Sequence, residues 1–293
     1  MDLPGSDTIS DDVDRTVTRF LDRLDRVLPG RVTGLYLVGS VALGAYRPGR
    51  SDIDVVAVLD VADGERLPAA DVRRLRAAHL VSGLRAGAAA LAGGHLLVPG
   101  AINGVFVRAA DLGRPVTTIE PLASQAGTSF RLGQGFDVNP VQWTTFARHG
   151  VTVRGPEPAA LGLDPEPERL AQWNLDNLAR YWVPWAERSR RRPGPRWRVA
   201  PGWSTAWGVL GAPRLHHTIA TGNVISKEAA GAWAKEVLEP RHHPIVDDGL
   251  AWWRGEPSGR AAADTATRAR ATGELVLAVA DAARRLNPKP HAG

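Results

Sequence analysis

Two aspartates stand one residue apart at the start of an apolar run, "SDIDVVAVLD", which spans residues 51–60. An unpaired carboxylate carried into a protein core is costly, so Asp52 and Asp54 need a compensating charge. Side chains alternate along a strand, and both carboxylates therefore point to the same face. Two carboxylates this close repel each other unless a cation lies between them. A divalent ion resolves the conflict, and Mg²⁺ prefers such oxygen ligands together with substrate phosphates.

A Gly39-Ser40 pair follows the apolar segment "GLYLV" at 34–38, and residues 41–51 separate it from the aspartates. Glycine lets a phosphate approach the backbone, and the serine hydroxyl and exposed N–H groups can donate to it. A lone D-x-D or a lone Gly-Ser is common, and either one by itself would be structural. The combination of both at this spacing is more specific and predicts a site for a magnesium-bound triphosphate.

Short apolar segments predict the strands that position these residues, at 34–38, 53–59 and 101–110. Apolar residues at helical spacing predict helices over 13–28, which Gly30 ends, and over 71–84. The order helix, strand, turn, strand, helix, strand is typical of a small α/β sheet.

Beyond Asn139 helical patterns dominate, over 140–149, 166–188, 203–221, 226–238, 244–254 and 261–286. All tryptophans except Trp143 lie after position 170. This shift predicts a fold of the class α/β plus α, with a mixed sheet flanked by helices in a domain over 1–139 and a helical domain over 140–293. The basic, proline-broken segment 188–198 is expected to be a loop.

The composition excludes several classes of protein. The 293 residues include no cysteine, so disulfides and thiolate metal sites are excluded, and no apolar run has the length of a membrane span. The net charge is +5, but the basic residues form no single long block, so no nucleic-acid partner is expected. The acidic start of the chain is unlike a signal peptide, and we expect a cytoplasmic monomer with no membrane partner.

The strand, Gly-Ser, D-x-D and strand pattern resembles the polymerase-β-like nucleotidyltransferase superfamily. Within it, the chain is similar to the aminoglycoside O-adenylyltransferases that modify streptomycin and spectinomycin, and the segments 138–156, 220–240 and 242–255 continue the resemblance. The resemblance implies antibiotic resistance through Mg²⁺-dependent transfer of AMP from ATP to a hydroxyl of a small molecule. It also implies an N-terminal nucleotidyltransferase domain, a helical C-terminal domain and an active site in the cleft between them.

Carried over by position, the ATP- and metal-binding residues of the family fall on the Gly39-Ser40 turn, Ser51, Asp52 and Asp54. The metal ions would lie on Asp52 and Asp54. The family's nucleotide contacts in the helical domain fall on Arg214, Lys227 and Trp253. Alternatively, Arg214 is an exposed helix residue, Lys227 is a solvated first-turn lysine and Trp253 is a core residue.

The family pattern breaks at two places. The position of the family's third carboxylate, which serves as general base, holds Asn103 in "INGVFV". An amide cannot accept a proton at neutral pH, and a lost general base commonly costs on the order of 10²–10⁴ in rate. The acceptor stretch 196–214 keeps Trp197, Trp203 and Trp207 but has no acidic residue to attract a polycationic drug.

These departures leave two alternatives open. Beside AMP transfer to an aminoglycoside-like compound, the alternatives are a degenerate nucleotide-binding protein without transferase activity and a nucleotidyltransferase whose acceptor is not an aminoglycoside. Paired histidines at 216–217 and 242–243 have no nearby carboxylate and are interpreted as surface or core residues, not as metal ligands.

Overall fold

A computed structural model describes residues 10–92, 101–191, 193–257 and 264–286. The chain divides into two compact units, Met1–Glu166 and Pro167–Gly293. The division therefore lies after the boundary expected at Asn139. The reason is that α4 (Pro140–His149) packs on the sheet and β6 (Val151–Arg154) pairs with its edge, so both elements belong to the first unit.

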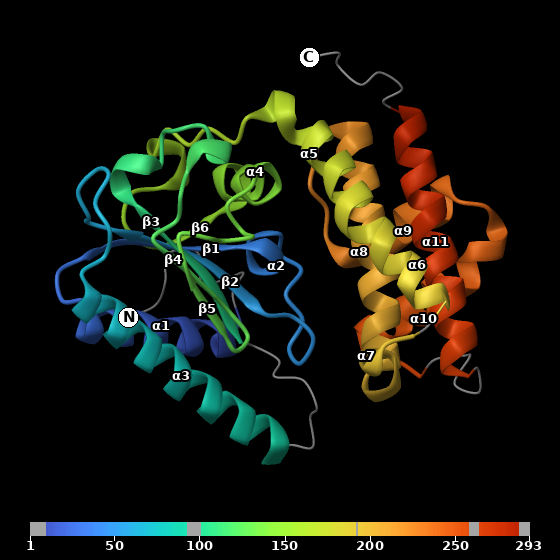
Figure 1. Ribbon diagram of the computed structural model, residues 1–293, viewed down its shortest axis with the longest axis horizontal. Helices are drawn as coiled ribbons and strands as arrows, with labels where there is room; N and C mark the ends of the chain where they lie inside the picture. Colours follow the sequence, from blue (N-terminus) through green and yellow to red (C-terminus); the bar gives the residue numbers. More distant parts are fainter. Residues whose placement is uncertain (1–9, 93–100, 192, 258–263, 287–293) are drawn as a thin grey trace. The chain divides into compact units, whose positions relative to one another are not determined.

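The first unit is built on a six-stranded mixed sheet with the order β5-β4-β3-β2-β1-β6 (Figure 1). Its other strands are β1 (Val32–Val38), β2 (Ile53–Leu59), β3 (Ile102–Arg108), β4 (Ala123–Ala126) and β5 (Ser129–Leu132). β2 and β3 are parallel, and the other neighbours are antiparallel. The three apolar strands expected from the sequence are thus confirmed.

Helices cover both faces of this sheet (Figure 1). α1 (Asp11–Val27) and α3 (Ala69–Ala92) lie on the face that buries Leu35, Val55 and Phe106. α4 covers the opposite face, where Trp143 and Phe146 are fully buried. Asn139 caps α4, since its side chain accepts a hydrogen bond from the Gln142 N–H at 3.0 Å. The mixed sheet with flanking helices confirms the expected fold class.

Three strands were not predicted from the sequence. These are β4, β5 and β6, which are only four residues long and carry polar side chains. Their backbone pairing, and not an apolar pattern, makes them strands. Short 3-10 turns fill the connections at η2 (Ala109–Asp111), η3 (Val116–Thr118), η4 (Pro158–Ala160), η5 (Pro167–Arg169) and η7 (Pro240–His242).

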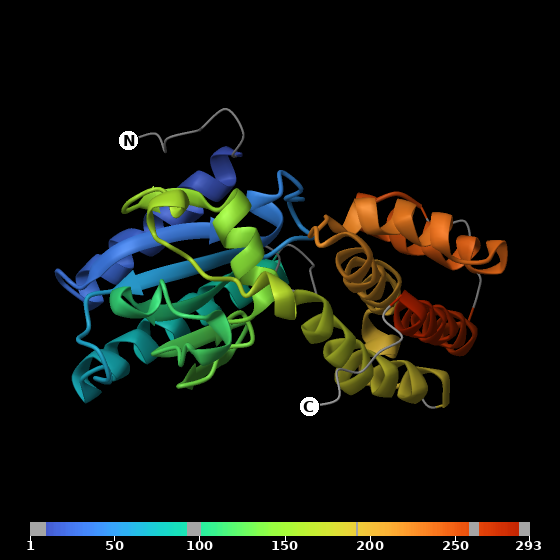
Figure 2. The same ribbon diagram turned by 90° about the horizontal axis from the view of Figure 1, so that it is seen from above.

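The second unit is helical, as expected. It contains α5 (Leu170–Asn177), the π-helical turn η6 (Leu178–Trp182), α6 (Val183–Arg191), α7 (Pro195–Val199), α8 (Pro201–Thr221), α9 (Lys227–Val237), α10 (His243–Arg254) and α11 (Thr265–Leu286). These helices gather around α8 (Figure 2).

Two expectations for this unit need correction or limits. The segment 188–198 is not a loop, because it holds the end of α6 and the short helix α7. The first residues of the helix expected over 261–286 lie outside the described residues. Within the part of the chain that the structure describes, no helix has both the length and the apolar character needed to cross a membrane.

The second unit is expected to lose stability in mild acid through His216. This buried ring accepts a hydrogen bond at Nδ1 from the Trp233 indole N–H at 3.0 Å, which requires the neutral form. Burial, and then the neighbouring His217 and Arg285, lower the pKa of His216. The unfolded chain takes up the proton near the ordinary pKa of about 6.5, so this stability is present above that pH and is lost as the pH falls below it.

The measurement is urea unfolding of the wild type and of His216→Gln at pH 7.5 and 5.5. The glutamine oxygen can still accept from the indole, so the fall in the unfolding midpoint should be smaller in the variant. Part of the fall will remain, because the pKa of the buried His242 is also lowered, first by its burial. An equal fall in both proteins would contradict the assignment to His216.

Candidate active site

Parallel pairing of β2 with β3 brings three polar side chains together. Asp54 lies beside Asn103 in the register. The Asn103 amide NH₂ donates to Asp52 Oδ2 at 3.2 Å and to Asp54 Oδ1 at 3.5 Å. Asp52 is exposed and Asp54 is half-buried. The amide NH₂ therefore donates a hydrogen bond to each carboxylate, which offsets the repulsion between their negative charges.

A second contact fixes how the Asn103 amide points. Its oxygen accepts a hydrogen bond from the Gly127 backbone N–H at 3.2 Å, in the turn between β4 and β5. Because a backbone N–H is always a donor, the amide oxygen must face Gly127 and the NH₂ must face the acidic pair. The oxygen is thus engaged, and the side chain offers only donors to the acidic pair.

The Gly39-Ser40 turn opens the short helix α2 (Gly39–Ala42) directly after β1. Gly39 has a φ of +61°, and a Cβ there would lie 2.2 Å from Asp54 Oδ2. Only glycine fits, because any side chain would collide with the carboxylate. The Ser40 hydroxyl lies 3.5 Å from the Asp52 carbonyl oxygen, so the turn and the aspartates form one cluster.

Ser51 lies in a different position from the other predicted residues. It is 2% exposed, and its hydroxyl oxygen accepts a hydrogen bond from the Arg47 backbone N–H at 3.0 Å. These contacts support the loop that leads into Asp52. The geometry therefore favours an indirect role for Ser51, through the loop that presents the aspartates.

The donor set of the cluster fits Mg²⁺. Its ligands would be carboxylate oxygens, which hard cations prefer, and Mg²⁺ commonly uses one or two carboxylates and completes its shell with water and phosphate oxygens. In the described ranges no group of three or more histidine, aspartate or glutamate side chains gathers to form a larger metal site. The interpretation of His216 and His242 as core residues agrees with their burial.

In the second unit, Arg214 on α8 and Lys227 at the start of α9 both lie beside the loop that joins the two helices. The Arg214 Nε donates to the Ile225 carbonyl at 2.8 Å, and Lys227 is the first residue of α9 after the cap Ser226. A cation at a helix N-terminus is unfavourable, because that end already carries positive partial charge. An anionic ligand at this end of α9 would compensate both charges.

Trp253 does not suit the predicted stacking on a base. It is 4% exposed and belongs to the apolar core of the second unit. The Lys227 ammonium lies 4.4 Å from the centre of its ring. Trp253 therefore acts as a core residue that also holds Lys227 through a cation–π contact.

The predicted acceptor stretch forms a stacked aromatic surface. The Trp203 and Trp207 rings are stacked at 5.3 Å, and Trp207 is stacked in turn on Trp182 at 5.6 Å. The Arg196 guanidinium lies 5.0 Å from the centre of the Trp203 ring. Trp197, by contrast, is buried. This surface offers aromatic ring faces and an arginine, and the stretch 196–214 contributes no carboxylate to it.

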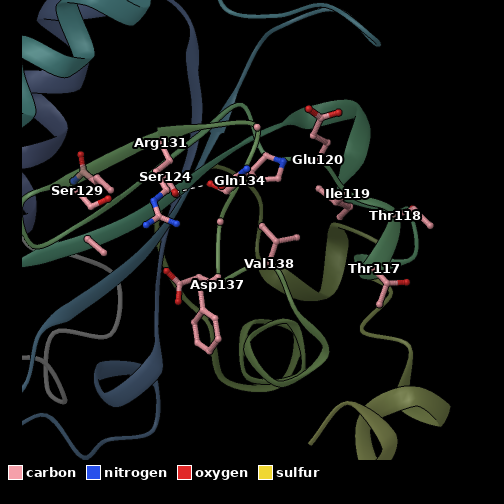
Figure 3. A pocket seen from close by; sticks show the side chains of 16 residues that line it. Thr117, Thr118, Ile119, Glu120, Ser124, Ser129, Arg131, Gln134, Asp137 and Val138 are labelled. Atoms are coloured by element: carbon pink, nitrogen blue, oxygen red, sulfur yellow. Dashed lines mark hydrogen bonds between the residues drawn. The ribbon is translucent and has the colours of Figure 1, made fainter. Parts of the chain in front are cut away.

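An open cavity of about 730 Å³ lies beside the β4–β5 hairpin and was not foreseen from the sequence (Figure 3). Its charged lining residues are Glu120, Arg131 and Asp137. In Figure 3 the Asp137 and Arg131 side chains lie on the same side of the cavity. Partial burial raises the pKa of the Asp137 carboxyl. No sequence signal marks this residue, because it stands in an irregular segment.

Comparison with known proteins assigns both units. Residues 17–82 match the family model of the nucleotidyltransferase domain, and residues 188–277 match that of the aminoglycoside adenylyltransferase C-terminal domain. The first unit thus resembles a nucleotidyltransferase domain, and the second resembles the C-terminal domain of aminoglycoside adenylyltransferases. The resemblance inferred from the sequence motifs is thereby confirmed.

A solved structure supports the fold of this nucleotidyltransferase-like chain. The crystal structure of spectinomycin adenyltransferase AAD(9) from Enterococcus faecialis with ATP and spectinomycin matches with a TM-score of 0.58 at 14% identity. The match covers 90% of this chain and 98% of that chain. At this identity the likeness establishes the fold alone. No curated protein matches the chain significantly.

Proposed function

We propose that the protein transfers AMP from Mg²⁺-bound ATP to an oxygen of a small molecule, with a hydroxyl of an aminoglycoside-like compound as the first acceptor to test. The observation that carries this proposal is the cluster of Asp52 and Asp54 with the Gly39-Ser40 turn. The turn supplies a backbone that phosphate can approach, and the carboxylates supply ligands for the metal. The match of the first unit to a nucleotidyltransferase domain and of the second to an aminoglycoside adenylyltransferase C-terminal domain supports the same reaction.

In this proposal the residues have distinct tasks. Asp52 and Asp54 hold Mg²⁺, which when bound neutralises charge on the phosphates. The Ser40 hydroxyl and the N–H groups of α2 bind a phosphate. Asn103 keeps the carboxylates paired, but it cannot take a proton from the acceptor. Phosphoryl transfer depends mainly on positioning and charge stabilisation, so the cluster retains most of the machinery that the reaction needs.

The test is calorimetry with ATP in the presence and absence of Mg²⁺, followed by mass spectrometry of streptomycin and spectinomycin after incubation with Mg-ATP. We expect Mg²⁺-dependent ATP binding and a product that carries one added AMP. ATP binding that does not depend on Mg²⁺ would refute the proposed site.

Asn103 favours a second candidate function, a nucleotide-binding protein without transferase activity. The sequence resemblance aligns it with the family's general base, and its amide offers only donors to the acidic pair. This candidate predicts Mg²⁺-dependent ATP binding with no transfer of AMP to any acceptor. The two candidates therefore differ in turnover and agree in binding.

Replacing Asn103 with glutamate should increase both Mg²⁺ affinity and AMP transfer. The glutamate adds a third carboxylate beside Asp52 and Asp54, which a cation neutralises, and it supplies a base near the metal. Without Mg²⁺ the three carboxylates repel each other and the Gly127 N–H donates to a charged oxygen. We expect the melting temperature of Asn103→Glu to rise more with added Mg²⁺ than that of the wild type.

Asn103→Gln is the matched control, because it lengthens the side chain without adding charge. It should not gain Mg²⁺ affinity. Equal Mg²⁺ dependence of melting in the wild type and in Asn103→Glu would show that residue 103 does not lie at the metal site in solution.

We also propose that Arg214 and Lys227 bind the phosphates of the nucleotide. Charge-assisted hydrogen bonds to phosphate are worth roughly 1.5–3 kcal/mol each, so Lys227→Met should weaken ATP binding by about 10- to 100-fold. Lys235→Met is the control, because it removes the same charge from the last turn of the same helix. Calorimetry with Mg-ATP measures the ATP affinity of both variants. Equal effects of the two variants would indicate a general effect of charge, and not a phosphate site at Lys227.

A further inference from the structure

The cavity beside the β4–β5 hairpin lies on the sheet face that carries the acidic pair. Asn103 and Val105 are two residues apart on β3 and point to the same face. Val105 pairs directly with Ser124, which lines the cavity. Ala126 also lines it, and the next residue, Gly127, donates to the Asn103 oxygen. The cavity and the acidic pair are therefore neighbours on one surface.

Asp137 reaches this cavity on a segment that is fastened to the sheet. The Ser124 hydroxyl donates to the Gln134 carbonyl at 2.6 Å, drawn as a dashed line in Figure 3. At Gly135 a Cβ would lie 3.2 Å from Val105 Cγ2, so the backbone lies directly on β3. These two contacts place the segment over the sheet face and hold Asp137 at the cavity wall.

The Asp137 carboxylate is half-buried, and within the described ranges no hydrogen bond or ion pair engages it. The other charged groups that line the cavity are Arg131 and Glu120, both exposed. Partial burial raises the pKa of Asp137, which makes the carboxylate a stronger proton acceptor than an ordinary aspartate. Fold stability gives no evident reason for a half-buried carboxylate without a partner.

We propose that Asp137 accepts the proton of the acceptor hydroxyl, the task that Asn103 cannot perform. This inference rests on the proposed function. The acceptor lies in the cavity, and its hydroxyl oxygen forms a bond to the α-phosphorus of ATP. The bond from that phosphorus to the bridging oxygen breaks, and pyrophosphate leaves with the electron pair. The hydroxyl proton moves to Asp137, directly or through one water, and is then released to solvent.

The test compares Asp137→Asn with Glu120→Gln, which neutralises the other carboxyl group of the same cavity. Formation of AMP products and pyrophosphate is measured with Mg-ATP and each of three acceptors, spectinomycin, streptomycin and water. We expect kcat of Asp137→Asn to fall by about 10²–10⁴-fold, whereas Glu120→Gln, which lines the acceptor cavity, should change the KM for the acceptor and leave kcat within a few-fold. Calorimetry should give the same Mg-ATP affinity for all three proteins, which separates a lost base from a damaged nucleotide site.

Two further readouts distinguish a base from a structural role. The wild-type kcat should decline at acid pH as Asp137 becomes protonated, and this decline should disappear in the residual activity of Asp137→Asn. Adding Asn103→Glu to Asp137→Asn should restore activity, because it supplies a carboxylate at the position of the family's base.

The outcomes separate this inference from the proposed function. If the wild type forms product and Asp137→Asn retains activity within about threefold, the base assignment is wrong while the transferase function stands. Equal losses in Glu120→Gln and Asp137→Asn would also overturn it, since they would indicate a general effect on the cavity. If the wild type binds Mg-ATP but transfers AMP to none of the three acceptors, the proposed transferase function is wrong, and the base assignment is wrong with it.

Discussion

Replacing both Asp52 and Asp54 with asparagine should abolish the Mg²⁺ enhancement of ATP affinity and reduce AMP transfer by on the order of 10³-fold or more. The reason is that these carboxylates are the metal ligands of the proposed site. The fold should survive, because each asparagine keeps a carbonyl oxygen that can accept from the Asn103 NH₂. Calorimetry with ATP, with and without Mg²⁺, measures the effect, and thermal unfolding checks the fold.

The matched control is Asp60→Asn with Asp63→Asn. It removes the same two charges from exposed positions just past the end of β2. The control should keep the Mg²⁺ enhancement, since the change in net charge alone is screened by salt. If the Asp52 and Asp54 double variant binds ATP equally well with and without Mg²⁺ while the control behaves in the same way as the wild type, the site is confirmed. Retention of the enhancement in both would exclude the aspartates as ligands.

Gly39→Ala should disable the site almost as completely through one added methyl group. The Cβ would lie 2.2 Å from Asp54 Oδ2 and 3.1 Å from its Cγ, so the carboxylate must move away from Asn103 and Asp52. The positive φ of +61° adds backbone strain of about 1–2 kcal/mol. We expect loss of Mg²⁺-dependent ATP binding together with a total destabilisation of roughly 2–4 kcal/mol.

Gly44→Ala separates the effect of the collision with Asp54 from the effect of backbone strain. Gly44 has the same φ of +61°, but nothing lies within 4 Å of a Cβ placed there. This variant should show only the backbone cost of about 1–2 kcal/mol and should keep Mg²⁺-dependent ATP binding. Urea unfolding and calorimetry measure both variants. Normal ATP binding in Gly39→Ala would mean that Asp54 has another productive position and that the close packing at Gly39 is not required.

Local pattern was enough to predict the centre of the proposed site. Asp54 and Asn103 lie on apolar strands and Asp52 comes directly before the first of them, and side-chain alternation follows from backbone geometry alone. That Asn103 lies beside Asp54 depends on the parallel pairing of β2 with β3, which only the structure shows. The Gly-Ser turn was predicted because glycine lets a phosphate approach the backbone, whereas the positive φ of Gly39 and its close contact with Asp54 were seen only in the structure.

Tertiary contacts decided what the amide of Asn103 does. Its residue type alone shows that it cannot act as a base. Its orientation, however, depends on the Gly127 N–H, which comes from a hairpin of two short polar strands. Those strands carry no apolar pattern, so neither the hairpin nor the cavity beside it was predictable. Asp137 stands in an irregular segment whose place over β3 is set by Gln134 and Gly135.

Burial likewise could not be inferred from residue type. Trp253 matched a nucleotide contact of the family by position, yet the packing of α8, α9 and α10 places it in the core. The end of the first unit at Glu166 depends on long-range pairing of β6 with β1, and the preceding α4 has a helical pattern that resembles those of the second unit. A sequence pattern specifies periodicity and local turns, whereas burial and partnership depend on elements that are distant in the chain.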